Sequence, residues 1–169
     1  FPALARPLCE NTGLMTEPLL ESLPAATAQL LADKIRSRRA RVGVVGLGYV
    51  GLPLAVEFAR AGFTVTGIDV SEEKARRVNA GESYIHHIPS ARIQTLLNDK
   101  QFEATSDFGR LSEPDCIIIC VPTPLTPKKD PDMQYIETTA DAVCKTLRRG
   151  QLVSLESTTY PGTTDELLL

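Results

Sequence analysis

Three glycines with the spacing G-x-G-x-x-G, Gly46, Gly48 and Gly51, directly follow a short apolar run. In such a loop the first glycine permits a tight turn, the second lets a pyrophosphate approach the backbone, and the third lets a helix pack closely on a strand. The N–H groups at the start of the helix, near Tyr49 and Val50, are then expected to face the anion. The position between a strand and a helix favours a dinucleotide site over glycines that serve only turn and packing.

An acidic residue follows this loop at the distance that a dinucleotide site requires. Asp69 stands roughly 20 residues beyond the glycines, at the end of the next apolar run. A carboxylate there accepts hydrogen bonds from the adenosine ribose and repels a 2′-phosphate, which predicts NAD rather than NADP. A helix-capping role is the alternative for Asp69. Lys74 either reaches the same ribose or is solvated, and the sequence leaves both interpretations open.

The elements that must position these residues alternate regularly from Arg41 onward. β-branched and apolar runs predict five strands, at 41–46, 63–69, 102–105, 115–121 and 151–157. Helical patterns lie between them or follow them, at 49–61, 71–81, 90–98 and 133–149. Strands joined by helical crossovers predict an α/β fold with a Rossmann-type doubly wound parallel sheet. The last residues predict a turn and the start of a helix, so the sequence ends before the sixth strand of such a sheet.

The segment before the first strand is expected to be an appendage. Residues 1–23 contain several prolines and little periodicity, which indicates a loose lead-in, and Met15 is a plausible start, so residues 1–14 are candidate non-native residues. Pro24 fits the first turn of a helix over 24–40. Residues 41–169 are then the NAD-binding domain.

Charge and hydropathy narrow the class of protein. The formal net charge is −3 and the pI is near 5.4, which argues against a general nucleic-acid or anionic-membrane surface. No window approaches the roughly 18 consecutive apolar residues of a spanning helix. We therefore expect a soluble, cytoplasmic protein without nucleic-acid or membrane partners.

The cysteines and histidines do not predict a metal site. Neither a C-x-x-C motif nor a Cys/His metal spacing occurs among Cys9, Cys116, Cys120 and Cys144, which are expected to be small buried hydrophobes. His86 and His87 are adjacent, so they point in different directions, and no third ligand is visible. A loop role is favoured over a general base or a metal pair.

Four separated motifs resemble one family in their order along the chain. GLGYVGLPLA, GESYIHHIPS, CVPTPL and SLESTTYPGTT are similar to the N-terminal domain of the UDP-glucose/GDP-mannose dehydrogenase family, from about Lys34 to Leu169. Within it, they are most similar to the bacterial UDP-N-acetylglucosamine 6-dehydrogenases of surface-polysaccharide synthesis. The resemblance implies oxidation of C6 of a UDP-sugar, from alcohol to carboxylate, with two NAD+. It also implies a homo-oligomeric parent whose dimer contact and nucleophilic cysteine lie in sequence that is not present here, so the chain alone is expected to be inactive.

The resemblance also implies a role for individual residues. The pyrophosphate would be held by Gly46, Gly48, Tyr49, Val50 and Gly51, and the adenine ribose by Asp69 and Lys74. Thr123 would contact the cofactor, and Thr159 would lie beside the nicotinamide and position the water that completes the second step. Each threonine has an alternative, because Thr123 could be a turn residue and Thr159 could cap a loop. Glu156 either orients that loop or binds backbone amides.

Other functions compete with this interpretation. A free-standing NAD-binding module would share the glycine loop without catalysing a reaction. A 3-hydroxyacid dehydrogenase would share the loop too, but would not be expected to contain VPTP followed by ESTTYPGTT. The sugar also stays open, with UDP-glucose and UDP-N-acetylmannosamine as alternatives to UDP-N-acetylglucosamine.

Overall fold

The computed structural model describes residues 25–125, 131–159 and 161–165. The strands are β1 (Arg41–Val45), β2 (Thr64–Ile68), β3 (Phe102–Thr105), β4 (Cys116–Ile119) and β5 (Leu152–Leu155). The helices are α1 (Ala25–Arg36), α2 (Gly51–Arg60), α3 (Glu72–Asn79), α4 (Ser90–Asn98) and α5 (Gln134–Cys144), with a short 3₁₀ helix, η2 (Phe108–Ser112). None of the described helices has the length and apolar character needed to cross a membrane.

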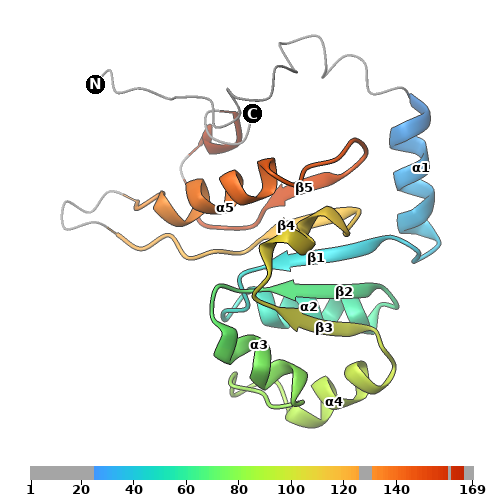
Figure 1. Cartoon of the computed structure of the whole chain (residues 1–169), viewed down its shortest axis with the longest axis vertical. Coiled ribbons are helices and arrows are strands. Elements are labelled where there is room, and N and C mark those ends of the chain that lie inside the picture. Colours follow the sequence, from blue (N-terminus) through green and yellow to red (C-terminus); the bar gives the residue numbers. More distant parts are fainter. Residues whose placement is uncertain (1–24, 126–130, 160, 166–169) are drawn as a thin grey trace.

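The five strands form one parallel sheet in the order β3-β2-β1-β4-β5 (Figure 1). The register places Val45 opposite Ile68 of β2 and Ile119 of β4. The chain runs from β1 outward to β3, then returns to the other side of β1 to form β4. At this reversal the loops that follow β1 and β4 diverge, which opens a crevice at the carboxyl ends of the strands. The predicted doubly wound parallel sheet is confirmed.

Two hydrophobic clusters lie on the opposite faces of the sheet. Because successive side chains of a strand point to opposite faces, Val44 belongs to the cluster beneath α2, α3 and α4, while its neighbour Val45 belongs to the other. In β4, Ile118 joins the first cluster, whereas Ile117 and Ile119 pack with residues of η2 and α5. Burial on both faces explains why β1 and β4 are almost wholly apolar.

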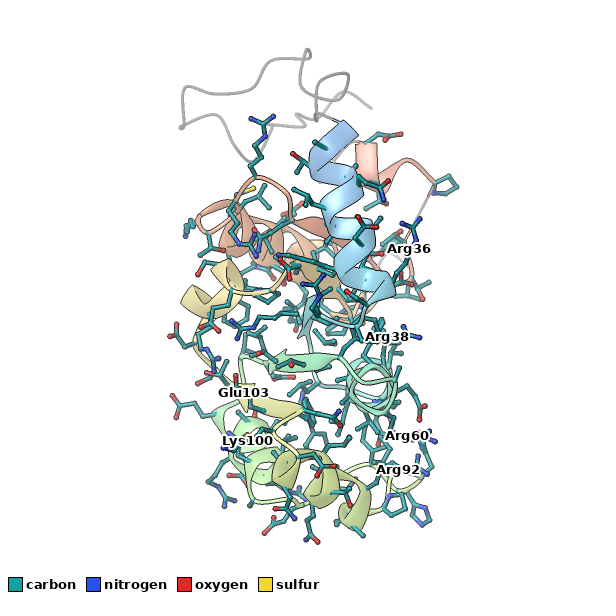
Figure 2. All side chains as sticks on the ribbon, turned by 90° about the vertical axis from the view of Figure 1, so that its right-hand side faces the viewer. Arg36, Arg38, Arg60, Arg92, Lys100 and Glu103 are labelled. Carbon is teal, nitrogen blue, oxygen red and sulfur yellow. The ribbon has the colours of Figure 1, made fainter. Side chains whose placement is uncertain are left out.

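Helix α1 stands beside the amino ends of the strands, at the right of Figure 1. The ammonium of Lys34 binds the carboxylate of Asp115 at 2.8 Å, and the guanidinium of Arg38 lies 4.9 Å from the centroid of the Phe63 ring. Figure 2 shows Arg38 just beyond the end of this helix. The helix ends at Arg36, earlier than predicted, because Arg38 adopts a left-handed conformation with φ of 61° that turns the chain into β1.

Other helix boundaries also differ from the sequence prediction, and α3 is shorter than predicted, at Glu72–Asn79 rather than 71–81. Helix α2 begins at Gly51 rather than Tyr49, so Tyr49 and Val50 belong to the loop. Helix α5 ends at Cys144 rather than Arg149. Beyond the helix, the Arg148 N–H donates to the side-chain oxygen of Gln151 at 2.8 Å rather than to a helical carbonyl oxygen. The Arg148 guanidinium donates to the carbonyl oxygens of Ser112 and Pro114 in the chain before β4, each at 2.8 Å. The predicted lead-in, residues 1–23, lies outside the described residues.

Candidate functional site

The three glycines of the loop between β1 and α2 have different surroundings. Gly46 has a φ of +91°, and a Cβ there would overlap the carbonyl of Cys120. A Cβ at Gly51 would overlap the carbonyl oxygen of Gly46, so both positions need glycine for close backbone packing. At Gly48 a Cβ would meet no atom within 4 Å. Gly48 therefore leaves open space in which an outside group can approach the backbone.

The same loop presents free backbone donors. Within the described part of the chain, no hydrogen bond uses the N–H groups of Gly48, Tyr49 or Val50. The bonds of α2 start with the Leu52 N–H, which donates to the carbonyl oxygen of Gly48 at 3.1 Å. Unpaired N–H groups at a helix start carry partial positive charge and attract anions. The loop has both the space and the donors that a pyrophosphate needs.

Asp69 lies just beyond β2, only 4% exposed, and binds three donors. Its carboxylate accepts from the Leu47 N–H at 2.7 Å, the Ser71 N–H at 2.9 Å and the Lys74 ammonium at 3.0 Å. Lys74 therefore reaches this carboxylate. Ser71 rather than Asp69 caps α3, since its hydroxyl accepts from the Lys74 N–H. A carboxylate has about four acceptor positions, so one is left for a ligand hydroxyl.

One cavity of about 400 Å³ brings most of the predicted residues together. Seven of them line it: Gly46, Gly48, Tyr49, Val50, Asp69, Lys74 and Thr123. The rest of the lining comes from Cys120, Val121, Pro122, Glu156, Ser157 and Thr158. The other two predicted residues, Gly51 and Thr159, are not among the lining residues. Gly51 packs against Gly46 beneath the loop, and Thr159 follows the lining residue Thr158, half-buried.

The loops after β4 and β5 form the wall opposite the glycines. The Thr123 hydroxyl donates to the carbonyl oxygen of Thr158 at 2.6 Å, and the Ser157 hydroxyl donates to that of Val121 at 2.8 Å. These bonds hold the two loops together. Glu156 is exposed at the cavity and accepts a hydrogen bond from the Ser154 hydroxyl at 2.8 Å.

A second cavity, of about 510 Å³, lies on the α5 side of Asp69. It shares five lining residues with the first: Gly46, Asp69, Lys74, Val121 and Pro122. Sequence reasoning missed its α5 residues: Gln134, Tyr135, Thr138, Thr139 and Ala142. Their spacing, i, i+1, i+4, i+5 and i+8, places them on one helical face, which is the signal that could have found them. Exposed Val70 and half-buried Phe108 add apolar surface.

Cys120 lies in the first cavity but is a poor nucleophile. Burial, together with the negative charge of Glu156, raises the pKa of its thiol to about 11, so the thiol stays protonated near neutral pH. Cys116 is also buried, and Cys9 lies outside the described residues. His86 and His87 are exposed in a loop. Among the residues that the structure describes, no group of three or more His, Cys, Asp or Glu could hold a metal ion.

Comparison with known proteins agrees with this geometry. Residues 40–169 match the family model described as "UDP-glucose/GDP-mannose dehydrogenase family, NAD binding domain". A UDP-N-acetyl-D-mannosamine dehydrogenase of Pyrococcus horikoshii is 38% identical over 128 residues, covering 75% of this chain and 30% of that protein. A UDP-N-acetyl-D-glucosamine 6-dehydrogenase of Pseudomonas aeruginosa is 35% identical over 126 residues, covering 75% and 29%.

Solved structures give the same assignment. A ternary complex of GDP-mannose dehydrogenase from Pseudomonas aeruginosa superposes with a TM-score of 0.72 at 32% identity, covering 76% of this chain and 30% of that one. The chain thus spans about 30% of the length of the relatives it matches. Taken with the glycine loop and the buried Asp69, these matches show that the chain belongs to the UDP-glucose/GDP-mannose dehydrogenase family, as its NAD-binding domain.

Proposed function

We propose that this chain supplies the NAD site of a dehydrogenase that oxidises C6 of a UDP-N-acetylhexosamine to the uronic acid. The observation that carries the proposal is the convergence of free loop amides, the Asp69–Lys74 pair and the joined loops after β4 and β5 on one cavity. Within this class, the motifs SYIHHIP and LESTTYPGTT favour UDP-N-acetylglucosamine as the sugar. Synthesis of a surface polysaccharide is the role that this substrate suggests.

Each part of NAD has a matching surface. The N–H groups of Gly48, Tyr49 and Val50 would hold the pyrophosphate, and the free acceptor position of Asp69 would take an adenosine ribose hydroxyl. The more apolar second cavity would take the adenine ring. The nicotinamide would then extend toward Thr123 and the loop that ends in Thr159. When bound, NAD+ accepts the hydride that leaves the sugar.

The residues of this chain bind and orient the cofactor and do not supply the nucleophile. The raised pKa of Cys120 keeps its thiol neutral, and Cys116 is buried in the sheet. The chain also covers only 30% of its relatives, so most of such an enzyme lies outside it. We therefore expect this chain alone to bind NAD without oxidising a UDP-sugar. Formation of NADH by the purified chain with NAD+ and UDP-N-acetylglucosamine would contradict this.

Calorimetric titration with NAD and NADP tests the cofactor site. Asp69 is buried, and a 2′-phosphate beside it would place two negative charges in contact. NAD should bind more tightly by about 1 to 3 kcal/mol, which is roughly fivefold to 150-fold. Equal affinities would remove Asp69 from the proposed ribose site.

The sugar is tested on the full-length dehydrogenase that contains this domain. UDP-N-acetylglucosamine should give faster NADH formation than UDP-glucose, with about two NADH per sugar for the four-electron oxidation. UDP-N-acetylmannosamine is the second candidate, because the Pyrococcus horikoshii dehydrogenase named for that sugar is 38% identical. A preference for UDP-glucose, or one NADH per sugar, would contradict the proposal.

A further inference from the structure

The segment 81–89 links α3 to α4 and contributes no lining residue to either of the two cavities. Its two isoleucines, Ile85 and Ile88, are 3% and 4% exposed and belong to the same hydrophobic cluster as Leu47. The two histidines between them are exposed. The segment is therefore anchored in the core beside the glycine loop, because Leu47 is the residue between the first two glycines.

Tyr84 connects this segment to the loop. Its hydroxyl donates to the carbonyl oxygen of Leu47 at 2.7 Å. The Arg77 guanidinium lies 5.3 Å from the ring centroid and donates to the Ser83 carbonyl oxygen at 3.3 Å, which fixes the ring from the α3 side. Burial raises the pKa of Tyr84, and the charge of Asp69 raises it further, so the hydroxyl keeps its proton and remains a donor.

Three parts of Leu47 are held in place: its N–H, its C=O and its side chain. Asp69 accepts from its N–H at 2.7 Å, and Tyr84 donates to its C=O at 2.7 Å. Its side chain is 0% exposed and fills the space that a Cβ would need at Gly67. Both hydrogen-bonding partners come from the stretch between the end of β2 and α4, so one part of the chain fixes the middle of the loop.

The direction of the Tyr84 bond matters for the cofactor. The Leu47 C=O and the Gly48 N–H belong to one planar trans peptide unit, in which the two groups point in opposite directions. Binding the C=O on the Tyr84 side therefore aims the Gly48 N–H away from Tyr84. Gly48 lines the first cavity, and its N–H has no partner in the described part of the chain.

We propose that Tyr84 is a positioning residue that holds the Leu47–Gly48 peptide in the orientation in which the Gly48 N–H can bind the cofactor pyrophosphate. This rests on the proposed placement of NAD at the glycine loop. Without the hydroxyl, the Leu47 C=O loses its hydrogen-bond partner and the Leu47–Gly48 peptide rotates more easily, because Gly48 restricts the backbone little. The NAD affinity then falls in proportion to the fraction of molecules that keep the competent orientation.

The test compares Tyr84→Phe with Ser83→Ala in this chain. Tyr84→Phe removes only the hydroxyl and keeps the ring beneath Arg77. Ser83→Ala removes a hydroxyl from the same segment, one that bonds the Ile85 carbonyl and not the loop. Tyr84→Phe should weaken NAD and ADP by about three- to tenfold, the effect of one neutral hydrogen bond, and leave adenosine affinity unchanged. Ser83→Ala should leave all three unchanged.

Amide hydrogen exchange of Gly48, followed by NMR with bound NAD, gives a second readout. It should be faster in Tyr84→Phe and unchanged in Ser83→Ala. If the unaltered chain binds neither NAD nor ADP, the proposed function fails. If it binds both, but Tyr84→Phe leaves affinity and exchange unchanged, only the role of Tyr84 is overturned. An equal loss for adenosine and ADP would also overturn it, because the effect would then be a general loss of structure.

Discussion

Two buried aspartates stand at opposite ends of the sheet. Asp69, 4% exposed, follows β2 at the carboxyl end, and Asp115, 5% exposed, precedes β4 at the amino end. Each accepts hydrogen bonds from a backbone N–H and from a lysine. Judged by burial and bonding alone, the two are equivalent, yet only Asp69 lines the two cavities described above.

Their partners explain the difference. Asp115 binds the Lys34 ammonium at 2.8 Å, the Arg41 N–H at 3.0 Å and the Arg148 guanidinium at 3.2 Å, which joins α1, β1 and the chain after α5. Burial alone would raise the pKa of Asp115, but these donors outweigh it and hold that pKa below its ordinary value. Asp115 thus joins segments far apart in the sequence.

Asp69 instead orients a loop whose other donors remain free. Its acceptance of the Leu47 N–H fixes the glycine loop, while the N–H groups of Gly48, Tyr49 and Val50 stay unpaired within the described residues. A buried, well-bonded carboxylate is therefore not a ligand site by itself. Free donors and open space beside it make it one.

The largest effect is expected from Gly51→Ala. Because the new Cβ would overlap the carbonyl oxygen of Gly46, the glycine loop and α2 must separate, which should cost about 3 kcal/mol of unfolding free energy and abolish NAD binding. Gly48→Ala is the matched control, since its Cβ meets no atom within 4 Å. It should keep near-native stability and lose NAD affinity, because the methyl group occupies space left for the cofactor. Urea unfolding and calorimetry measure both, and equal stabilities would contradict the packing argument.

Asp115→Ala should lower the stability of the fold and leave NAD binding nearly unchanged. Three donors lose their acceptor, but Lys34 and Arg148 are partly exposed and regain water, so we expect a loss of about 2 kcal/mol in unfolding free energy. NAD affinity should change less than about twofold, because the residue lies at the other end of the sheet. Exposed Asp99→Ala is the control and should cost under about 0.5 kcal/mol. A large loss of NAD affinity in Asp115→Ala would contradict the view that Asp115 stabilises the fold while Asp69 serves the cofactor site.

Asp69→Asn, in contrast to Asp115→Ala, should weaken NAD binding. The amide keeps an oxygen for one donor but loses the charge that pairs with Lys74 and accepts the ribose hydroxyl. NAD affinity should fall by about 1 to 2 kcal/mol, or roughly five- to thirtyfold, and the preference over NADP should shrink. Calorimetry with both cofactors measures this. Full retention of the NAD preference would show that another group reads the ribose.

The smallest effect is expected for the pH dependence, in acid, of the contribution that Asp115 makes to the unfolding free energy. Its folded pKa lies below the unfolded value of about 3.9, so its stabilisation is fully present above that pH and is lost as pH falls toward the folded pKa. The difference in unfolding free energy between the unaltered chain and Asp115→Asn should stay constant from about pH 7 to pH 5 and narrow below about pH 4. Denaturant unfolding across this range measures it, and a difference that widens in acid would contradict the lowered pKa.

Sequence patterns predicted the elements and part of the site, because those signals act over short distances. The alternation of apolar runs and helical patterns identified all five strands, and the glycine spacing with Asp69 indicated a dinucleotide loop. The predicted positions of the helix ends were less accurate. Helix α5 stops at Cys144, and beyond it the Arg148 guanidinium binds a carbonyl group 34 residues earlier in the chain, a contact that no local pattern reveals.

By itself, the sequence determined the strand–loop–helix unit around Gly46, the acid at Asp69 and the parallel α/β architecture, because each depends on neighbours within one element or one crossover. Only the tertiary structure decided that Tyr84 would bind the carbonyl of Leu47, and that Asp115 would join Lys34, Arg41 and Arg148. The strand order β3-β2-β1-β4-β5 is what brings these partners together. Contacts between residues tens of positions apart depend on that order, and the local patterns that predict a helix or a strand contain no information about it.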